Sequence, residues 1–448
     1  MLLKLSKFFL YASVFAVLIV MISAFFPFIG GKDYYFRFTV ELALICFVLW
    51  WGFVAEPGAA RKMAKASFAK PMFIAVSLFV LVFLLASAFA YDPVSAFWSN
   101  YERGEGGFQM IHYYAFFVLL SLLFTTKEDW AMLMKVSVMA AVFMILYGVL
   151  ANLGLVKTFI SVYQEGTPPA GVWSRLTQGR FQGSLGNPAY VAPYLLFSLF
   201  YLAYLWVSRS AKTVLSGLGY GGLALVFLFL FVLSQTRGAF VGLGTAVFVF
   251  LAYLAWHSKD LRKWLLSILV VCVALVSGLI YYHDSAFVKK LPGGRIFDIS
   301  ISDQTVTTRL WTWGSAWEGF KERPILGWGP ENFSAVFDKY FNPGHYVPGK
   351  NTETWFDRAH SLYFDALVET GALGFLSYFG IFAVLFWQLA RFSANNVRSA
   401  VVQKGLIIAL SLGYLVQGLA IFDVLPIYIN LFLFFAFSNF YVNQYESR

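Results

Sequence analysis

The chain has 448 residues, of which 60% are hydrophobic and only 12% are charged. A soluble domain usually carries about 25% charged residues, so this composition excludes an ordinary soluble protein and predicts an integral membrane protein. The formal net charge of +10 does not indicate nucleic acid as a partner, because about half of the cations flank apolar runs, where they meet lipid headgroups.

The two cysteines, Cys46 and Cys272, both lie inside apolar runs. A single thiol in such a run is most often a small hydrophobic side chain, so we expect neither a disulfide framework nor a thiolate metal site. The first apolar run, residues 8–29, follows Lys4 and Lys7. It is longer than the core of a signal peptide, about 7–15 residues, and has no clear cleavage site, so we expect it to be the first membrane span.

Twelve apolar runs are candidates for spanning helices, since a helix needs roughly 20 such residues to cross a bilayer. They cover residues 8–29, 36–55, 72–91, 108–125, 130–154, 188–207, 213–234, 238–256, 264–283, 361–389, 402–421 and 425–441. An inner N-terminus puts sixteen lysines and arginines in inner segments and seven in the short outer ones. Since cations favour the cytoplasmic side, we expect both termini inside and any chemistry outside.

These runs predict an all-α membrane protein in three parts: spans one to nine in residues 1–283, an outer loop subdomain with short helices in 284–360, and spans ten to twelve in 361–448. The loop exceeds about 60 residues, a length that crosses the membrane largely regardless of charge. Within it, "RLWTWGSAWEGFKERP" (309–324) puts four apolar side chains on one helix face, with Pro324 as a stop. These four are Leu310, Trp313, Trp317 and Phe320. We expect this helix to lie flat at the membrane surface.

Four segments bring an unusual cation or imidazole to the outer ends of the spans. They are "SNYERGEGG" (99–107) with Arg103, "GRFQGSLGNP" (179–188) with Arg180, "SQTRGAF" (234–240) with Arg237, and "WFDRAHSLYFDALVETG" (355–371) with His360. Arg237 has almost no loop around it, and an arginine near the bilayer centre costs about 2.5–3.5 kcal/mol. A ligand anion such as phosphate would match its guanidinium fork. The alternative is that Arg237 reaches the headgroups or pairs with a distant acid such as Asp423.

Around Arg180, the glycines at 179, 183 and 186 and Pro188 at a helix start predict a closely packed turn with free N–H groups, which favour an anion. The alternative is an ordinary turn with a solvated arginine. His360 is one of five histidines without metal-ligand spacing to one another, so we expect no metal site. A histidine at a helix entrance is often structural, but beside arginines a neutral imidazole is suited to take a proton from a hydroxyl. Five further residues are candidates for substrate binding: Arg103, Arg309, Gln182, Asn187 and Glu369. Glu369 lies about half a turn away from His360 on the same helix, so we do not expect it to orient the ring.

The sequence resembles the O-antigen ligase and polymerase superfamily of bacterial polysaccharide membrane proteins in an ordered set of segments covering most of residues 97–382. These are "FWSNYERGEGGFQMIHYY" (97–114), "GRFQGSLGNPAYVAPYLL" (179–196), "SQTRGAFVGL" (234–243), "PILGWGPENF" (324–333) and "AHSLYFDALVETGALGFLSYFGIF" (359–382). The functional arginines of that family fall on Arg180 and Arg237, and its loop histidine falls on His360.

The resemblance implies a metal-independent inverting glycosyltransferase of the bacterial inner membrane. Such an enzyme transfers a glycan from undecaprenyl diphosphate to an acceptor hydroxyl at the periplasmic face, with no cofactor. For a ligase the acceptor is the lipid A core, as in lipopolysaccharide biosynthesis. On this reading Arg180 and Arg237, with Arg103 or Arg309, clamp the diphosphate, and His360 deprotonates the acceptor.

Four other functions stay open at this point. The weakest is a purely structural lipid-binding protein, which would leave His360 without a role. A polymerase of repeat units or an oligosaccharyltransferase that glycosylates proteins would share the donor and differ in the acceptor. A transporter of the lipid-linked glycan belongs to a different class, for which twelve spans is also a common number. Transporters often have two related halves and polar sites near the bilayer midplane, and neither pattern is visible in this sequence.

Overall fold

The computed structural model describes residues 1–100, 103–156, 171–177, 179–298, 304–346, 354–391 and 398–446, and within these ranges every regular element is a helix. Ten of these helices are long and apolar enough to cross a membrane. They are α2 (Gly30–Phe53), α4 (Pro71–Ala88), α7 (Lys127–Asn152), α10 (Pro188–Ser208), α11 (Val214–Leu233), α12 (Arg237–His257), α13 (Arg262–Tyr281), α17 (Leu362–Arg391), α18 (Arg398–Gln417) and α19 (Leu425–Glu446). The described residues therefore form a helical membrane protein, as the sequence predicts. Ten helices meet the criteria for a span, whereas twelve spans were expected.

The other two expected spans differ from the rest. The run 108–125 forms α6 (Gly107–Leu123), which has 17 residues. The run 8–29 does not form one continuous helix, because α1 (Leu2–Ser13) and the 3₁₀ helix η1 (Val14–Leu18) are followed by a non-helical turn.

Buried polar contacts explain why the helix stops in this first run. The Lys32 ammonium donates hydrogen bonds to the carbonyl oxygens of Ile19 (2.5 Å) and Ser184 (2.8 Å). The Ser184 hydroxyl in turn donates to the carbonyl oxygen of Val17 over 2.6 Å. These contacts use carbonyls that a continuing helix would need, so the chain turns back and enters α2.

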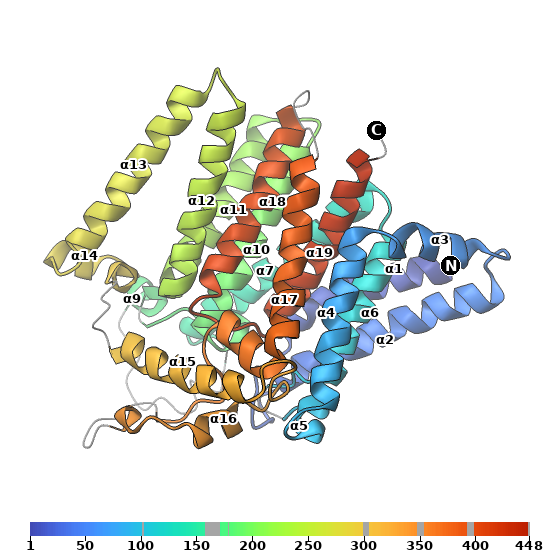
Figure 1. Cartoon of the computed structure of the whole chain (residues 1–448). Helices are drawn as coiled ribbons and strands as arrows, with labels where there is room; N and C mark the ends of the chain where they lie inside the picture. Colours follow the sequence, from blue (N-terminus) through green and yellow to red (C-terminus); the bar gives the residue numbers. More distant parts are fainter. Residues whose placement is uncertain are drawn as a thin grey trace.

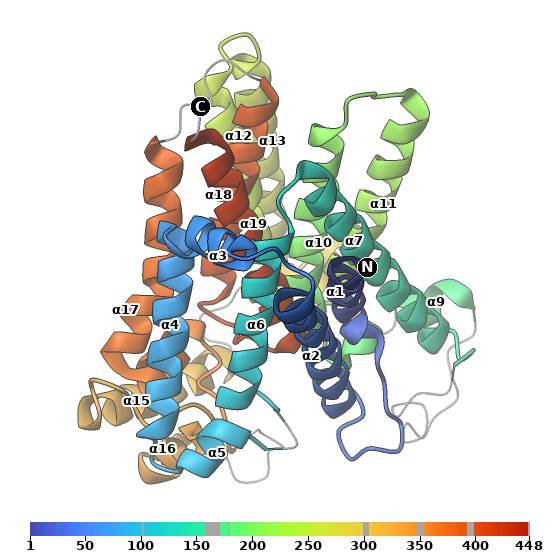
Figure 2. The same cartoon turned by 90° about the vertical axis from the view of Figure 1, so that its right-hand side faces the viewer.

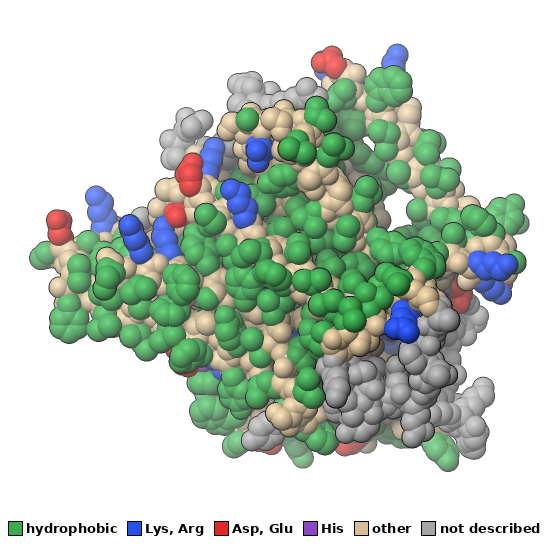
Figure 3. All heavy atoms as spheres, turned by 180° about the vertical axis from the view of Figure 1, so that it is seen from behind, with side chains coloured by type: hydrophobic (Ala, Val, Ile, Leu, Met, Phe, Trp, Pro, Cys, Tyr) green, Lys and Arg blue, Asp and Glu red, His purple; other side chains and the backbone are tan. Residues whose placement is uncertain are grey.

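The helices differ strongly in how much of their surface other helices cover. The most apolar stretch of α19 is 89% buried, whereas α13 has no buried residue. Figures 1 and 2 show α19 among the other helices of the bundle, and Figure 1 shows α13 leaning outward at the edge. Seen from behind, hydrophobic side chains cover most of the surface and charged ones are few (Figure 3). A surface of this kind is expected for a protein whose solvent is lipid.

Successive helices alternate in direction, and this alternation sorts the connections into two groups. The α10–α11 and α12–α13 turns and the C-terminus lie at one end of the bundle, the upper end in Figures 1 and 2. The other end carries α15 (Gln304–Glu322) and several short helices, among them α5 (Pro93–Trp98), α14 (Ala286–Lys290), η3 (Gly294–Phe297), α16 (Phe333–Lys339) and η4 (Pro343–His345). The four segments with the candidate cations and His360 also belong to that end.

The helix expected within 309–324 is α15, and it ends before Pro324. Its four apolar side chains do not share one environment. Leu310 and Trp317 are exposed, whereas Trp313 stacks on Phe364 at 5.1 Å and donates its indole N–H to a backbone carbonyl. Part of the face therefore packs against the start of α17, which holds α15 over that end of the bundle.

Candidate active site

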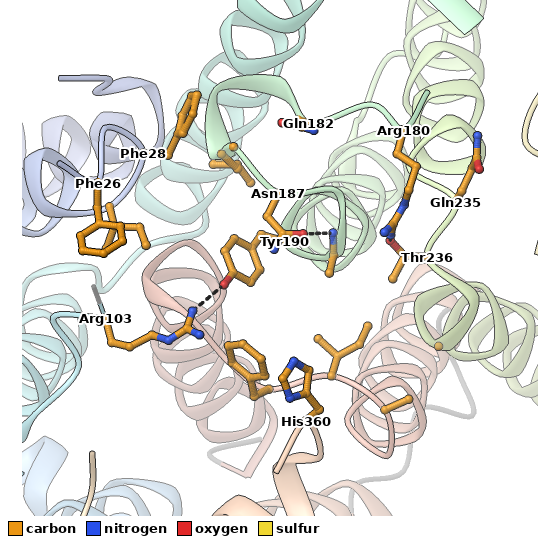
Figure 4. Close-up of a pocket in the computed structure, with 18 of the residues that line it drawn as sticks. Phe26, Phe28, Arg103, Arg180, Gln182, Asn187, Tyr190, Gln235, Thr236 and His360 are labelled. Atoms are coloured by element: carbon orange, nitrogen blue, oxygen red, sulfur yellow. Dashed lines mark hydrogen bonds between the residues drawn. The ribbon is translucent and has the colours of Figure 1, made fainter. Parts of the chain in front are cut away.

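A single cavity of about 1330 Å³ gathers nearly all the candidate site residues (Figure 4). Its walls come from the turn before α2, the loop before α6, the segment before α10, the α11–α12 turn, the first turns of α15, the loop before α17 and the α18–α19 connection. Seven of the eight residues expected from the sequence line it: Arg103, Arg180, Gln182, Asn187, Arg237, Arg309 and His360. Segments about 400 residues apart in the chain, from Ile22 to Phe422, thus share one site.

Close backbone approach positions Arg180. Gly186 has φ +74°, and a Cβ there would lie 2.2 Å from the ring of Phe28, so only glycine fits without a shift. The Arg180 guanidinium donates from Nε to the carbonyl oxygen of Ser234 (2.9 Å) and from Nη2 to the hydroxyl of Thr236 (3.2 Å). Figure 4 shows Arg180 and Thr236 together at one side of the cavity. Arg180 is thus oriented by neutral groups, which leave its charge uncompensated.

The pKa of Arg180 reflects this setting. Burial lowers it from its usual value, and the positive charges of Arg295 and Arg237 lower it further. A site that destabilises its own cations in this way is stabilised when an anion enters.

Arg237 is the first residue of α12, next to the turn that holds Arg180. It pairs with the carboxylate of Asp298, with 3.4 Å between Nη2 and Oδ2. Asp423, the partner that the alternative hypothesis suggested, accepts hydrogen bonds from the hydroxyls of Tyr378 and Tyr414 instead. Arg237 therefore has a carboxylate partner, but it is Asp298, which is nearer in the sequence than Asp423.

Arg103 is held by an ion pair with two hydrogen bonds. Its Nε and Nη2 atoms donate to the two carboxylate oxygens of Asp357 at 2.7 and 2.9 Å, and Nη1 donates to the hydroxyl of Tyr190 at 3.0 Å. Its guanidinium also lies over the ring of Phe422, 5.1 Å from the centroid. Burial raises the pKa of Asp357, but the hydrogen bonds and charge of Arg103 outweigh it and leave that pKa lowered. Arg103 thus fixes the loop that carries His360.

His360 points its ring into the cavity (Figure 4). Its Nδ1 atom lies 3.1 Å from the carbonyl oxygen of Arg358. A carbonyl can only accept, so Nδ1 carries the proton and Nε2 is left as an acceptor. The rings of Phe356 and Phe422 pack edge-on against the imidazole at 5.4 and 5.1 Å. Burial, and then the charge of Arg309, lower the pKa of His360 to about 4. The ring is therefore neutral at neutral pH.

The remaining expected residues have different surroundings. The Asn187 carboxamide oxygen accepts from the backbone N–H of Ala189 and caps α10. Gln182 lines the cavity, and its Oε1 atom is buried without a hydrogen bond from the described residues. Glu369 is outside the cavity lining and pairs with Arg358 at 2.5 Å.

The structure adds residues that sequence reasoning did not single out. Arg295, Tyr190, Asp357 and Phe422 also line the cavity. Arg295 follows Gly293 and Gly294 at the start of η3, and Arg180 likewise follows a glycine. The long loop has many other basic residues, so this pattern did not distinguish Arg295 from them.

The charge of the site is strongly unbalanced. Among the described residues that line the cavity there are five arginines and one carboxylate, that of Asp357. Asp298, which pairs with Arg237, is a second carboxylate beside this lining. A desolvated cluster of this kind favours a multiply charged anion, and guanidinium groups match phosphate oxygens best. Within the described ranges, no group of three or more His, Cys, Asp or Glu side chains is placed to hold a metal ion.

In the part of the chain that the structure describes, fold and site together define an all-helical, multi-pass membrane protein with an arginine-lined cavity at one end of its bundle. The family model described as O-antigen ligase matches residues 222–379, about a third of the chain. The match includes Arg237, Arg295, Arg309 and His360, and it confirms the resemblance to the O-antigen ligase and polymerase superfamily. It supports a membrane enzyme of glycan transfer. No curated protein matches the chain significantly.

Proposed function

We propose that the protein is a glycosyltransferase of the O-antigen ligase type, which moves a glycan from undecaprenyl diphosphate to an acceptor hydroxyl at the periplasmic face of the bacterial inner membrane. The observation that carries this proposal is the cavity shared by Arg180, Arg237 and His360. It combines a binding region for a diphosphate with an imidazole whose Nε2 can accept a proton. Its volume of about 1330 Å³ exceeds the roughly 300–1,000 Å³ typical of small-ligand sites, as a diphosphate with attached sugars requires.

In this proposal Arg180 and Arg237 bind the diphosphate, with Arg295 beside them. His360 takes the proton of the acceptor hydroxyl on Nε2, and the acceptor oxygen attacks the anomeric carbon. The bond from that carbon to the diphosphate oxygen breaks, and its electron pair stays on the diphosphate, where the arginines stabilise the added charge. Attack from the face opposite the leaving group gives inversion. No step of this scheme needs a metal ion.

The surroundings of His360 fit this order of events. In the empty site the imidazole is a weak base, because burial and the charge of Arg309 lower its pKa. A bound diphosphate neutralises the nearby arginines and raises the pKa of the ring. His360 therefore becomes a stronger base once the donor is bound.

The identity of the acceptor separates the ligase from its closest alternatives, a polymerase and a protein oligosaccharyltransferase. The test is a cell-free assay with purified protein, the glycan on undecaprenyl diphosphate, and a chelator. Lipid A core, a second donor molecule and a protein acceptor are offered separately. We expect transfer to the lipid A core in the presence of chelator. Transfer only to the second donor would make the protein a polymerase, and a strict divalent-metal requirement would contradict the mechanism.

A transporter of the same lipid-linked glycan is the alternative from another class. It would move the donor across liposomes without an acceptor, and a variant lacking both the Arg237 and His360 side chains would keep that movement. The glycosyltransferase proposal expects no such acceptor-independent movement.

A further inference from the structure

A second cluster of charges lies directly behind the cavity, around Arg358. This side chain is only 8% exposed. Its Nη1 atom donates to Glu369 over 2.5 Å, Nη2 donates to Glu331, and a carboxylate oxygen of Glu105 lies 3.8 Å from Nη2. A buried guanidinium is tolerated only with such compensation, and three carboxylates provide it here.

The three carboxylates come from three distant parts of the chain. Glu105 precedes α6, Glu331 lies between α15 and α16, and Glu369 belongs to α17. One guanidinium therefore joins the α5–α6 loop, the α15–α16 connection and α17. The backbone of Arg358 itself lies two residues before His360.

Every residue from 357 to 360 is tied to a different neighbour. Asp357 holds Arg103 through two hydrogen bonds, as described above. The Ala359 N–H donates to the Asp365 carboxylate over 2.7 Å, and the Ala359 carbonyl accepts from the Trp313 indole over 3.0 Å. The Arg358 carbonyl accepts from Nδ1 of His360.

His360 itself has φ +57°, a left-handed conformation that is uncommon outside glycine. Such a conformation persists only where the surrounding structure enforces it. The side chain of Arg358 is anchored on one side of this backbone turn, and the imidazole is held by its carbonyl on the other. The same residue thus fixes both the turn and the protonated nitrogen of the ring.

We propose that Arg358 is a positioning residue for His360: clasped by Glu105, Glu331 and Glu369, it sets the backbone that orients the imidazole and keeps Nε2 facing the cavity as the acceptor. This inference rests on the proposed function only for the measurements of glycan transfer. It assigns Arg358 a role in the geometry of the site and no contact with the substrate.

The main difficulty in testing this role is that Arg358→Gln alone leaves three buried carboxylates without their cation, so that variant can fail to fold. The triple substitution Arg358→Gln, Glu331→Gln and Glu369→Gln removes one positive and two negative charges and keeps groups able to hydrogen-bond. Arg358→Lys is the second variant, because it keeps the charge and loses the fork that reaches two carboxylates at once. The control is Lys7→Gln with Asp129→Asn, which neutralises an ion pair between α1 and α7, away from the cavity lining.

Two measurements decide the question. Nitrogen-15 NMR of histidine-labelled protein, with His360→Ala for assignment, reports which ring nitrogen of His360 carries the proton. Transfer kinetics report kcat and KM for the donor. We expect the triple variant and Arg358→Lys to lose the pure Nδ1-protonated form, to lose about 10²-fold in kcat, and to keep the donor KM within about twofold, since a displaced base slows the chemical step alone. The control should match the wild type in both measurements.

The NMR result decides the inference even if the proposed function fails. An unchanged Nδ1-protonated ring in folded triple and Arg358→Lys variants would overturn it, as would wild-type kcat in both. Absence of transfer by the wild type would sink the proposed function and leave the NMR result to decide the role of Arg358.

Discussion

Nδ1 of His360 donates a hydrogen bond to the carbonyl oxygen of Arg358 over 3.1 Å, and this contact determines which nitrogen of the ring faces the cavity. Nε2, the hydrogen-bond acceptor of the ring, therefore faces the cavity that the arginines also line. The imidazole and the cations are therefore held in place by the protein itself, as the proposed mechanism requires.

Removing the imidazole tests its role as the base. We expect His360→Ala to reduce kcat by about 10²–10⁴-fold, the usual contribution of a positioned general base. Initial rates of glycan transfer by purified protein measure this. His257→Ala is the matched control, because His257 is an exposed histidine at the far end of α12 and should leave the rate unchanged. Normal turnover by well-folded His360→Ala would exclude the proposed mechanism.

The pH dependence follows from the lowered pKa of His360, which lies at about 4 in the free protein. The neutral ring is the active form, so kcat/KM should stay level through neutral pH and fall only as the pH drops toward that value. A bound diphosphate raises the pKa, so kcat should begin to fall at a higher pH than kcat/KM. Profiles of both parameters over a wide pH range check the order.

Arg309 provides the control for that profile, since its charge contributes to lowering the pKa of His360. Arg309→Gln should move the acid limb of kcat/KM to higher pH. An unmoved limb would show that His360 is not the group that titrates. A wild-type limb near the ordinary histidine value of about 6.5 would contradict the lowered pKa of His360.

The ion pair of Arg103 and Asp357 predicts coupled kinetics. If Arg103 acts by holding the loop of His360, Arg103→Gln and Asp357→Asn should each lower kcat by a similar factor, and the double variant should be little worse than either. Steady-state kinetics of the four proteins make up the cycle. If Arg103 bound the diphosphate directly, Arg103→Gln alone would raise the donor KM while Asp357→Asn would not.

Two glycines in the segment before α10 separate backbone strain from steric overlap. Gly179 and Gly186 both have φ +74°, so an alanine at either position costs about 1–2 kcal/mol. A Cβ at Gly186 would also overlap the ring of Phe28, whereas no described atom lies within 4 Å of a Cβ at Gly179. Thermal unfolding in detergent should show a clearly larger loss of stability for Gly186→Ala. Equal losses would mean that the contact with Phe28 does not hold the loop.

Much of the architecture could be predicted because long apolar runs leave a membrane protein few alternatives. The alternation of helix directions then placed Arg103, Arg180, Arg237 and His360 at one end of the bundle, and the cavity contains all four. The first run, 8–29, differs because contacts to Lys32 and Ser184 compete with its helix, and these tertiary contacts have no local signal.

The partners of the site residues could not be predicted from the sequence, because they too are tertiary contacts without a local signal. Asp357 and Arg358 are adjacent in the chain, but their partners, Arg103 and Glu105, lie about 250 residues away. Hydrophobic periodicity indicates which face of a helix is buried and says nothing of which distant loops meet at its end.

Affinity measurements test most directly whether the arginines of the cavity bind a lipid-linked diphosphate. Binding of undecaprenyl diphosphate and of uncharged undecaprenol would be measured with purified protein in nanodiscs, for the wild type, for Arg180→Ala with Arg237→Ala, and for Arg209→Ala as an exposed control at the other end of α10. We expect the wild type and the control to prefer the diphosphate by tenfold or more and the double variant to lose that preference. Equal binding of the diphosphate by the double variant and the wild type would contradict the claim.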